Sequence, residues 1–268
     1  MNNKSSSEIV QSLVQKAQKA QSIFENYNQN QVDEVITAVA WTLCKPSNNK
    51  KISNLAVSET GLGNPEDKIL KNRRKTLGLL RDLKNIKTVG VINENKEKGI
   101  IEIAKPVGVV AAVTPSTNPA ATPINNIINA LKGRNSIIVS PSPAGSKVFK
   151  DLLILINNEL KKIGAPKDLI QTFDCDVTKE LTNELMKNVD LVIVTGSLNN
   201  VREAAKSGTK AIGVGQGNVT SIVDETADLE GAFKKIKMSK TFDNATSCSS
   251  ENNLILIEDI YEKAINLL

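Results

Sequence analysis

From Thr88 onward the chain alternates short, almost wholly apolar runs with stretches of helical periodicity. The run at 107–113 is apolar almost throughout, and amphipathic segments separate the later runs at 136–139, 169–173 and 190–194. Strands that are apolar at every position are buried on both faces, which is typical of a parallel sheet with helices on each side. The pattern therefore predicts a doubly wound α/β domain with a mostly parallel, Rossmann-like sheet.

Helical periodicity fills the first third of the chain. Four segments are predicted to be helical, at 9–17, 32–41, 52–60 and 66–84. Turn signals separate them at 45–49 and 61–65. Further strands are expected at 88–92, 100–103, 210–212, 219–223 and 254–257, and further helices at 145–163, 177–187, 198–206, 228–238 and 260–268. The basic cluster Arg73, Arg74 and Lys75 is interpreted as an exposed helix face.

Composition excludes several classes of function. The chain has no histidine, which rules out Ser-His-Asp hydrolysis and histidine-ligated zinc within it. Its 34 basic and 29 acidic residues are dispersed and only 3% of residues are aromatic, so no nucleic-acid partner is expected. No apolar run approaches the roughly 20 residues that span a bilayer, and residues 1–5 lack the apolar core of a signal peptide. We expect a cytoplasmic protein with reduced thiols, no metal and no membrane contact.

The three cysteines differ in their neighbours. Cys44 ends an apolar helical stretch, where burial raises a thiol pKa and leaves the group inert. Cys175 lies between two aspartates, whose charges oppose a thiolate. Cys248 lies among small hydroxyl residues at 246–250, with hydrogen-bond donors and little bulk around it. Cys248 is therefore the candidate nucleophile, with an incidental thiol as the alternative.

Three loops are candidate ligand sites. The glycines of 213–217 resemble part of a dinucleotide fingerprint, but a strand follows them instead of a helix, so a tight glycine turn is the preferred interpretation. The segment 194–197 ends a strand and opens a helix, which favours a phosphate site, or simply an N-cap at Ser197. The loop 114–119 follows the most apolar run, at the strand end where doubly wound sheets bind ligands; the alternative is a helix start with an early proline.

These segments occur in the order of a known family. Their succession resembles that of CoA-acylating aldehyde dehydrogenases, including the aldehyde half of bifunctional aldehyde-alcohol dehydrogenases. The matching segments are 59–63, 66–68, 105–110, 114–119, 140–143, 164–170, 195–197, 212–218, 224–228 and 240–248. The resemblance covers nearly the whole chain, and it implies a doubly wound fold of the aldehyde dehydrogenase type.

The resemblance also implies a chemistry. In the family, the cysteine matching Cys248 attacks the aldehyde, hydride passes to the nicotinamide of NAD(P), and the thioester transfers its acyl group to the co-substrate CoA. The implied cofactor-binding residues are Thr114, Pro115, Ser116, Ser140, Pro141, Thr195, Gly196, Ser197, Gly213 and Gly215. Hydrolytic relatives have an oxyanion-hole asparagine in the proline loop, and a gapless alignment places Thr117 there, one position before Asn118. Both are therefore possible oxyanion donors.

The division of the chain follows from the same resemblance. Residues 1–240 are expected to hold the N-terminal helices and the NAD(P)-binding domain, and residues 241–268 to begin a catalytic domain whose remainder is absent. Because the family also has a small oligomerisation hairpin, a homo-oligomer is expected at full length. Since the chain ends within a helical pattern, we expect that the natural protein continues and that this chain alone turns over nothing.

The expected acyl acceptor is CoA rather than water. Hydrolytic relatives carry a glutamate, the base that activates water, where this chain has Gly213. A glycine there is also expected to leave space beside Cys248. The two alternatives are a hydrolytic aldehyde dehydrogenase that releases free acid and a non-catalytic nucleotide-binding module. The sequence leaves the aldehyde open between acetaldehyde, a longer aldehyde and a sulfonated one.

Overall fold

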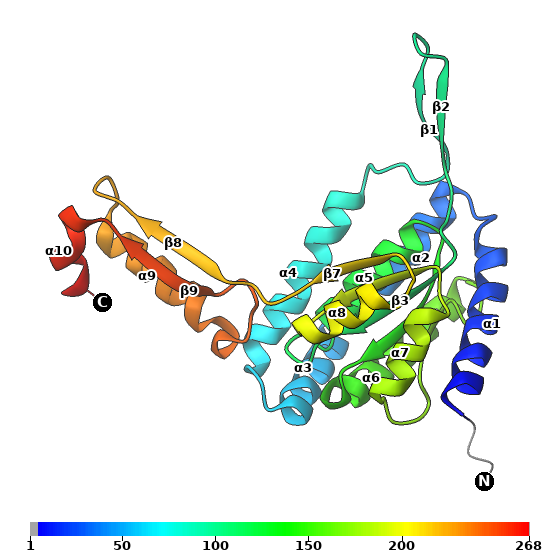
Figure 1. The fold of residues 1–268 in the computed structure, drawn as a ribbon, viewed down its shortest axis with the longest axis horizontal. Helices are drawn as coiled ribbons and strands as arrows, with labels where there is room; N and C mark the ends of the chain where they lie inside the picture. The colour runs from blue at the N-terminus through cyan, green and yellow to red at the C-terminus, as the bar shows by residue number, and fades with distance from the viewer. Residues whose placement is uncertain (1–4, 268) are drawn as a thin grey trace.

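A five-stranded parallel sheet forms the centre of the computed structural model, which describes residues 5–267 (Figure 1). Its strands are β3 (Val109–Thr114), β4 (Ser136–Pro141), β5 (Ile170–Thr172), β6 (Leu191–Thr195) and β7 (Ala211–Val214), in the spatial order β5-β4-β3-β6-β7. All four neighbouring pairs are parallel. The predicted doubly wound sheet is therefore confirmed, and its strand order reverses between β4 and β6, beside β3.

Both faces of this sheet are covered by helices. The helices that connect its strands are α5 (Ala121–Lys132), α6 (Ser146–Lys162), α7 (Lys179–Lys187) and α8 (Leu198–Lys206). Along β3, Val110 and Ala112 belong to one buried cluster, which α2, α5 and α6 complete, whereas Val109, Ala111 and Val113 belong to a second cluster with α1 and α7. Successive strand residues point to opposite faces, so the uninterrupted apolar run follows from burial on both sides.

The N-terminal third consists of four helices with sequence-encoded ends. They are α1 (Ser6–Phe24), α2 (Gln29–Cys44), α3 (Pro46–Thr60) and α4 (Pro65–Leu83). Ser5 and Asn28 form capping boxes before α1 and α2, and Asn64 caps α4. The break expected at 45–49 is wrong in extent: only Lys45 is extended, and α3 begins at Pro46, because proline is tolerated in the first turn of a helix.

A two-stranded hairpin projects from the sheet domain (Figure 1). It comprises β1 (Gly90–Asn95) and β2 (Ile100–Ala104), which pair antiparallel. Its large apolar side chains are exposed: Val91, Ile92, Ile100, Ile101 and Ile103. A two-stranded ribbon of this kind is only marginally stable by itself, and its apolar side chains leave it with surface to bury against another chain segment.

The C-terminal residues form a separate small layer, at the far side of α4 in Figure 1. Strands β8 (Val219–Val223) and β9 (Glu251–Leu256) pair in parallel, and α9 (Leu229–Thr241), the 3₁₀ turn η2 (Phe242–Ala245) and α10 (Tyr261–Ile265) complete the layer. Val223, Phe233, Ile260 and Ala264 form its own buried cluster. The division expected at residue 240 stays a prediction, and this packing favours an earlier boundary, near residues 215–218.

Most predicted elements coincide with observed ones, with two exceptions besides α3. Helix α5 is not among the predicted helices, although it is buried along most of its length. The glycine turn expected at 213–217 is wrong for Gly213, which lies inside β7. The predictions drawn from residues 1–4 and from Leu268 lie outside the described residues. Within residues 5–267, none of the helices has the length and apolar character that crossing a membrane requires.

Candidate functional site

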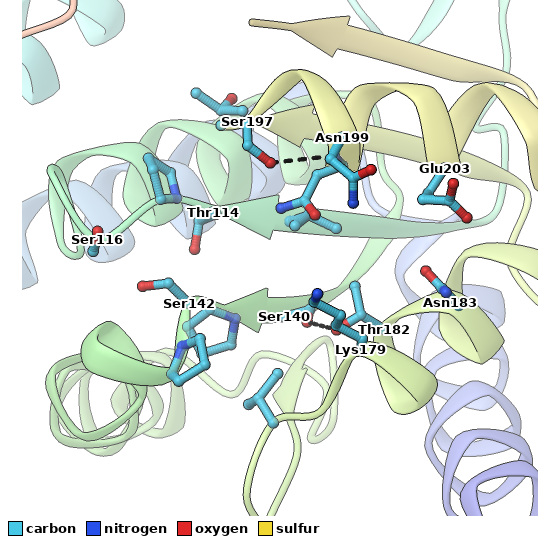
Figure 2. A pocket seen from close by; sticks show the side chains of 18 of the residues that line it. Thr114, Ser116, Ser140, Ser142, Lys179, Thr182, Asn183, Ser197, Asn199 and Glu203 are labelled. Atoms are coloured by element: carbon cyan, nitrogen blue, oxygen red, sulfur yellow. Dashed lines mark hydrogen bonds between the residues drawn. The ribbon is translucent and has the colours of Figure 1, made fainter. Parts of the chain in front are cut away.

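A cavity of about 530 Å³ lies at the carboxyl ends of β3, β4 and β6 (Figure 2). It is lined from the loops that follow these three strands and from the first turns of α7 and α8. Every predicted cofactor residue lines it except Gly213 and Gly215: Thr114, Pro115, Ser116, Ser140, Pro141, Thr195, Gly196 and Ser197. The strand order thus brings together residues that are spread over more than eighty positions in the sequence, at the switch point where such sheets bind ligands.

The polar groups of this cavity are suited to a phosphate-containing ligand. Thr114 is buried, and its hydroxyl has no hydrogen-bond partner although it faces the cavity. Ser197 Oγ accepts a hydrogen bond from the Asn200 N–H at 3.3 Å, so Ser197 is the N-cap of α8. The N-terminus of a helix attracts anions through its free N–H groups and its dipole. An unsatisfied buried hydroxyl beside a helix N-terminus fits the nucleotide that the sequence implies.

Gly213 and Gly215 have a different environment. A Cβ added at Gly213 would lie 2.6 Å from Val201 Cγ1, and one at Gly215 would lie 3.0 Å from Leu198 Cδ2. Both glycines therefore allow α8 to pack closely on the edge of the sheet. Val201 therefore occupies the space next to Gly213, and the expectation that Gly213 leaves space beside Cys248 stays a prediction.

The glycine that approaches Cys248 is Gly217. A Cβ there would overlap the carbonyl oxygen of Cys248, so only glycine permits the β7–β8 connection to pass this close. Cys248 itself is exposed, in the turn between η2 and β9. It does not line the cavity at the ends of β3, β4 and β6.

Of the other two thiols, Cys44 behaves as its neighbours predict. Cys44 is half-buried, and this burial raises its thiol pKa, against the smaller opposing effect of the Arg73 charge. Cys175 is exposed beside its two aspartates, and Lys150 Nζ donates to its carbonyl oxygen rather than to its sulfur. All three thiols are free. Of the three cysteines, only Cys248 has a glycine, Gly217, packed so closely against its backbone that a Cβ would not fit.

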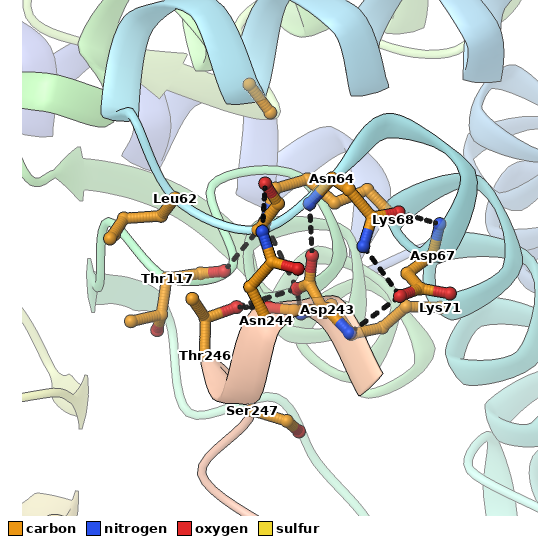
Figure 3. A network of polar contacts seen from close by, with 12 residues as sticks. Leu62, Asn64, Asp67, Lys68, Lys71, Thr117, Asp243, Asn244, Thr246 and Ser247 are labelled. Carbon is orange, nitrogen blue, oxygen red and sulfur yellow. Dashed lines mark hydrogen bonds and ion pairs between the residues drawn. The ribbon is translucent and has the colours of Figure 1, made fainter. Parts of the chain in front are cut away.

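A buried ionic network holds the turn that precedes Cys248 (Figure 3). The Asp243 carboxylate is fully buried and forms ion pairs with Lys71 and, at 3.1 Å, with Lys68, both also buried in α4. Thr246 Oγ1 donates to the same carboxylate at 2.8 Å. Burial by itself raises the pKa of the Asp243 carboxyl, but the hydrogen bonds from Lys71 and Thr246 and the charges of both lysines outweigh it and leave the pKa below its ordinary value.

The backbone around Asp243 is held in an unusual conformation. Asp243, Asn244 and Ala245 all have positive φ, at 52°, 52° and 59°. Such values cost non-glycine residues of the order of 1–2 kcal/mol each. The Asp243 N–H donates to Asp67 Oδ2 at 2.8 Å, and the Asn64 N–H donates to Asp243 Oδ1 at 3.1 Å. These contacts with α4 offset the conformational cost and fix η2, the turn that precedes Cys248.

The same network reaches the proline loop. Lys68 Nζ lies 3.5 Å from the carbonyl oxygen of Thr117, as well as 3.1 Å from Asp243. Asn118 is buried, and its Oδ1 has no hydrogen-bond partner. Lys68 therefore links Thr117, one of the two possible oxyanion residues, to Asp243 in the turn that precedes the candidate nucleophile. Sequence reasoning identified both loops but missed this link, because no local motif marks Lys68, Lys71 or Asp243 as partners.

Comparison with known proteins agrees with this geometry. The family model described as "Aldehyde dehydrogenase family" matches residues 2–268. The chain belongs to the aldehyde dehydrogenase family. Among the described residues of this aldehyde dehydrogenase chain, no group of three or more Cys, Asp or Glu side chains is placed to hold a metal ion.

Matches to individual relatives show which kinds of aldehyde dehydrogenase this chain resembles. The chain is 52% identical, over 97% of its length and 53% of the relative's, to a "Sulfoacetaldehyde dehydrogenase (acylating)" of Cupriavidus necator. It matches the crystal structure of an acetylating aldehyde dehydrogenase from Geobacillus thermoglucosidasius with a TM-score of 0.93 and 38% identity, over 98% of this chain and 58% of that one. A Rhodopseudomonas palustris propionaldehyde dehydrogenase with bound propionyl-CoA matches with a TM-score of 0.87 and 32% identity, over 97% of this chain and 57% of that one. The chain thus spans about half the length of the relatives it matches.

Proposed function

We propose that this chain is part of an enzyme that oxidises an aldehyde with NAD(P) and transfers the acyl group from Cys248 to CoA. One observation carries the choice of CoA over water: the position where the resemblance places the water-activating base is Gly213, which has no side chain to accept a proton. Gly213 stands where hydrolytic relatives have a glutamate. Asp67, which lines a cavity together with Ser247, Ser249 and Ser250, already accepts hydrogen bonds from Asn64 and Asp243. The names of the relatives, acylating and acetylating, support the same choice.

In this reaction Cys248 works first as nucleophile and then as leaving group. Its thiolate adds to the carbonyl carbon and gives a tetrahedral alkoxide, for which Thr117 and Asn118 are the proposed oxyanion loop. Collapse of the alkoxide restores the C=O bond and expels hydride, leaving an acyl thioester on Cys248; bound NAD(P)⁺ supplies the hydride acceptor. The CoA thiolate then forms a new acyl–sulfur bond, and Cys248 departs as thiolate.

The chain's own residues support the binding half of the proposal. Thr114, Ser140 and Ser197 are the proposed contacts for NAD(P), in the cavity at the switch point. The exposed apolar side chains of the β1–β2 hairpin support a homo-oligomer, in which another subunit covers them. A cytoplasmic location, where free thiols persist, is part of the same proposal. That the 268-residue chain alone turns over nothing stays a prediction.

Peptide mass spectrometry tests the covalent step. The protein at its full natural length is mixed with aldehyde and NAD(P) without CoA, and then denatured in acid. The proposal predicts one acyl group per subunit, attached at Cys248 and absent from Cys248→Ala. Cys175→Ala is the matched control and should acylate normally. Acylation at another residue, or none with rapid NAD(P)H formation, would contradict the proposal.

A further inference from the structure

A second cavity lies beside the turn at 247–250 that carries Cys248. Its volume is about 680 Å³, and it is enclosed by α4, by α9 and by the residues around Cys248. Ser247, Ser249 and Ser250 line it, so the residues on both sides of Cys248 face this space. The cavity is separate from the nucleotide cavity, with which it shares no lining residue. Cys248 itself is not in the lining, so a ligand in this cavity lies beside the turn that carries Cys248.

Positive charge without a partner marks this cavity. Arg74 of α4 and Lys235 of α9 both line it, and neither forms an ion pair with a described residue. The single acidic residue in the lining, Asp67, is held by the Asn64 and Asp243 hydrogen bonds. Arg74 is exposed, as the sequence predicts, and it also lines this cavity, whereas its neighbour Arg73 does not.

Hydroxyl groups add donors beside these cations. Ser250 is buried, and its Oγ has no hydrogen-bond partner. Ser247 Oγ and Ser249 Oγ lie 3.0 Å apart and share one hydrogen bond. Because a pair of hydroxyls has two protons and one shared bond uses only one, the pair keeps a proton that a ligand can accept. A buried hydroxyl without a partner is expected to find one in a ligand or in water.

We propose that this cavity binds the anionic end of a short aldehyde, a sulfonate or carboxylate separated from the carbonyl by one or two carbons. Arg74 and Lys235 provide the charge, and the serine hydroxyls the hydrogen bonds. The inference rests on the proposed function for Cys248 and names its substrate class. The phosphates of CoA fit this cavity less well, since its thiol and its phosphates lie at opposite ends of a long arm, while the residues directly before and after Cys248 line the cavity.

Alkylation of Cys248 by two reagents of nearly equal shape tests the site directly in the 268-residue chain. Iodoacetate and iodoacetamide both transfer a two-carbon group to sulfur and release iodide, but only iodoacetate carries an anion. The ratio of their rates at Cys248, read by mass spectrometry, measures the preference for negative charge. Arg74→Gln and Lys235→Gln should each lower this ratio about fivefold, and about 0.5 M salt should shrink the difference.

Two matched variants control for the loss of a positive charge at a distance. Arg73→Gln and Lys234→Gln each remove a cation from the same two helices without touching the cavity, and they should leave the ratio unchanged. Ethanesulfonate should protect Cys248 from both reagents. Equal effects of all four variants would overturn the proposal, as would protection by 3′,5′-ADP, the phosphate end of CoA, in place of ethanesulfonate.

The outcome is independent of acyl transfer, since alkylation needs neither NAD(P) nor CoA. If the rate ratio responds to Arg74 and Lys235 but no thioester forms at Cys248, the anion site stands and the proposed function fails. If the thioester forms but the ratio does not respond, the proposed function stands and the anion site fails.

Discussion

Lys68 Nζ lies 3.1 Å from Asp243 Oδ2, across 175 residues of sequence, and both side chains are buried. This contact joins α4 to the turn that carries Cys248. Lys71 completes the pair of cations, and Thr246 completes the hydrogen bonds of the carboxylate. The position of the candidate nucleophile therefore depends on residues from the N-terminal third of the chain as well as on its own neighbours.

Replacement of Asp243 by asparagine should be costly. The variant leaves two buried lysine charges without their counter-charge, and breaking a buried pair in this way typically costs about 3–5 kcal/mol. We expect the free energy of unfolding in urea to fall by that order. Asp259→Asn, on an exposed aspartate of the same layer, is the matched control and should change little. A loss no larger than in Asp259→Asn would show that the network does not stabilise the fold.

The contribution of Asp243 should depend on pH. Its carboxyl pKa is lowered in the folded chain, so it stabilises the fold fully above the unfolded carboxyl pKa of about 3.9 and loses this effect as pH falls through the lower folded value. The stability difference between the natural chain and Asp243→Asn should thus be flat from about pH 5 to 7 and shrink below pH 4. Urea unfolding at several pH values measures it. A stability difference that grows as the pH falls would contradict the lowered pKa of the Asp243 carboxyl.

Gly63 should be less replaceable than Gly61. Both have positive φ, at 74° and 67°, so alanine costs each about 1–2 kcal/mol of strain. A Cβ at Gly61 meets nothing within 4 Å, whereas one at Gly63 overlaps the Asp243 carboxylate. Thermal denaturation should therefore show a larger loss for Gly63→Ala than for Gly61→Ala. Equal losses would indicate that the carboxylate moves aside freely.

Thr114→Val should stabilise the ligand-free chain while weakening nucleotide binding. The Thr114 hydroxyl is buried without a partner, and leaving such a group unsatisfied costs about 1–3 kcal/mol. Thr172→Val is the matched control and should destabilise the chain, because Thr172 Oγ1 donates a hydrogen bond to Val139 O at 2.8 Å and valine removes it. Calorimetry and titration with NADH fluorescence measure the two effects. Unchanged affinity in Thr114→Val would remove this hydroxyl from the site.

The sheet could be predicted, and Cys248 could be chosen as the candidate nucleophile, because the signals for both are local. The apolar run that became β3 and the hydroxyl-rich setting of Cys248 are visible within a few residues. The partners of Asp243 could not be predicted, since a lysine on a helix reads as exposed until the tertiary fold buries it. The glycine turn expected at Gly213 was wrong for the same reason. Gly213 lies within β7 and packs closely against Val201 of α8, and the sequence alone does not distinguish a glycine required by such packing from one required by a turn.

The acceptor of the acyl group is the central claim, and product formation with and without CoA tests it most directly. The protein at full natural length is given an aldehyde and NAD(P), and NAD(P)H and free acid are followed together. Because a missing general base costs about 10²–10⁴-fold in hydrolysis, we predict a burst of one NAD(P)H per subunit that stops and resumes only when CoA is added. Rapid steady-state release of free carboxylic acid without CoA would contradict it.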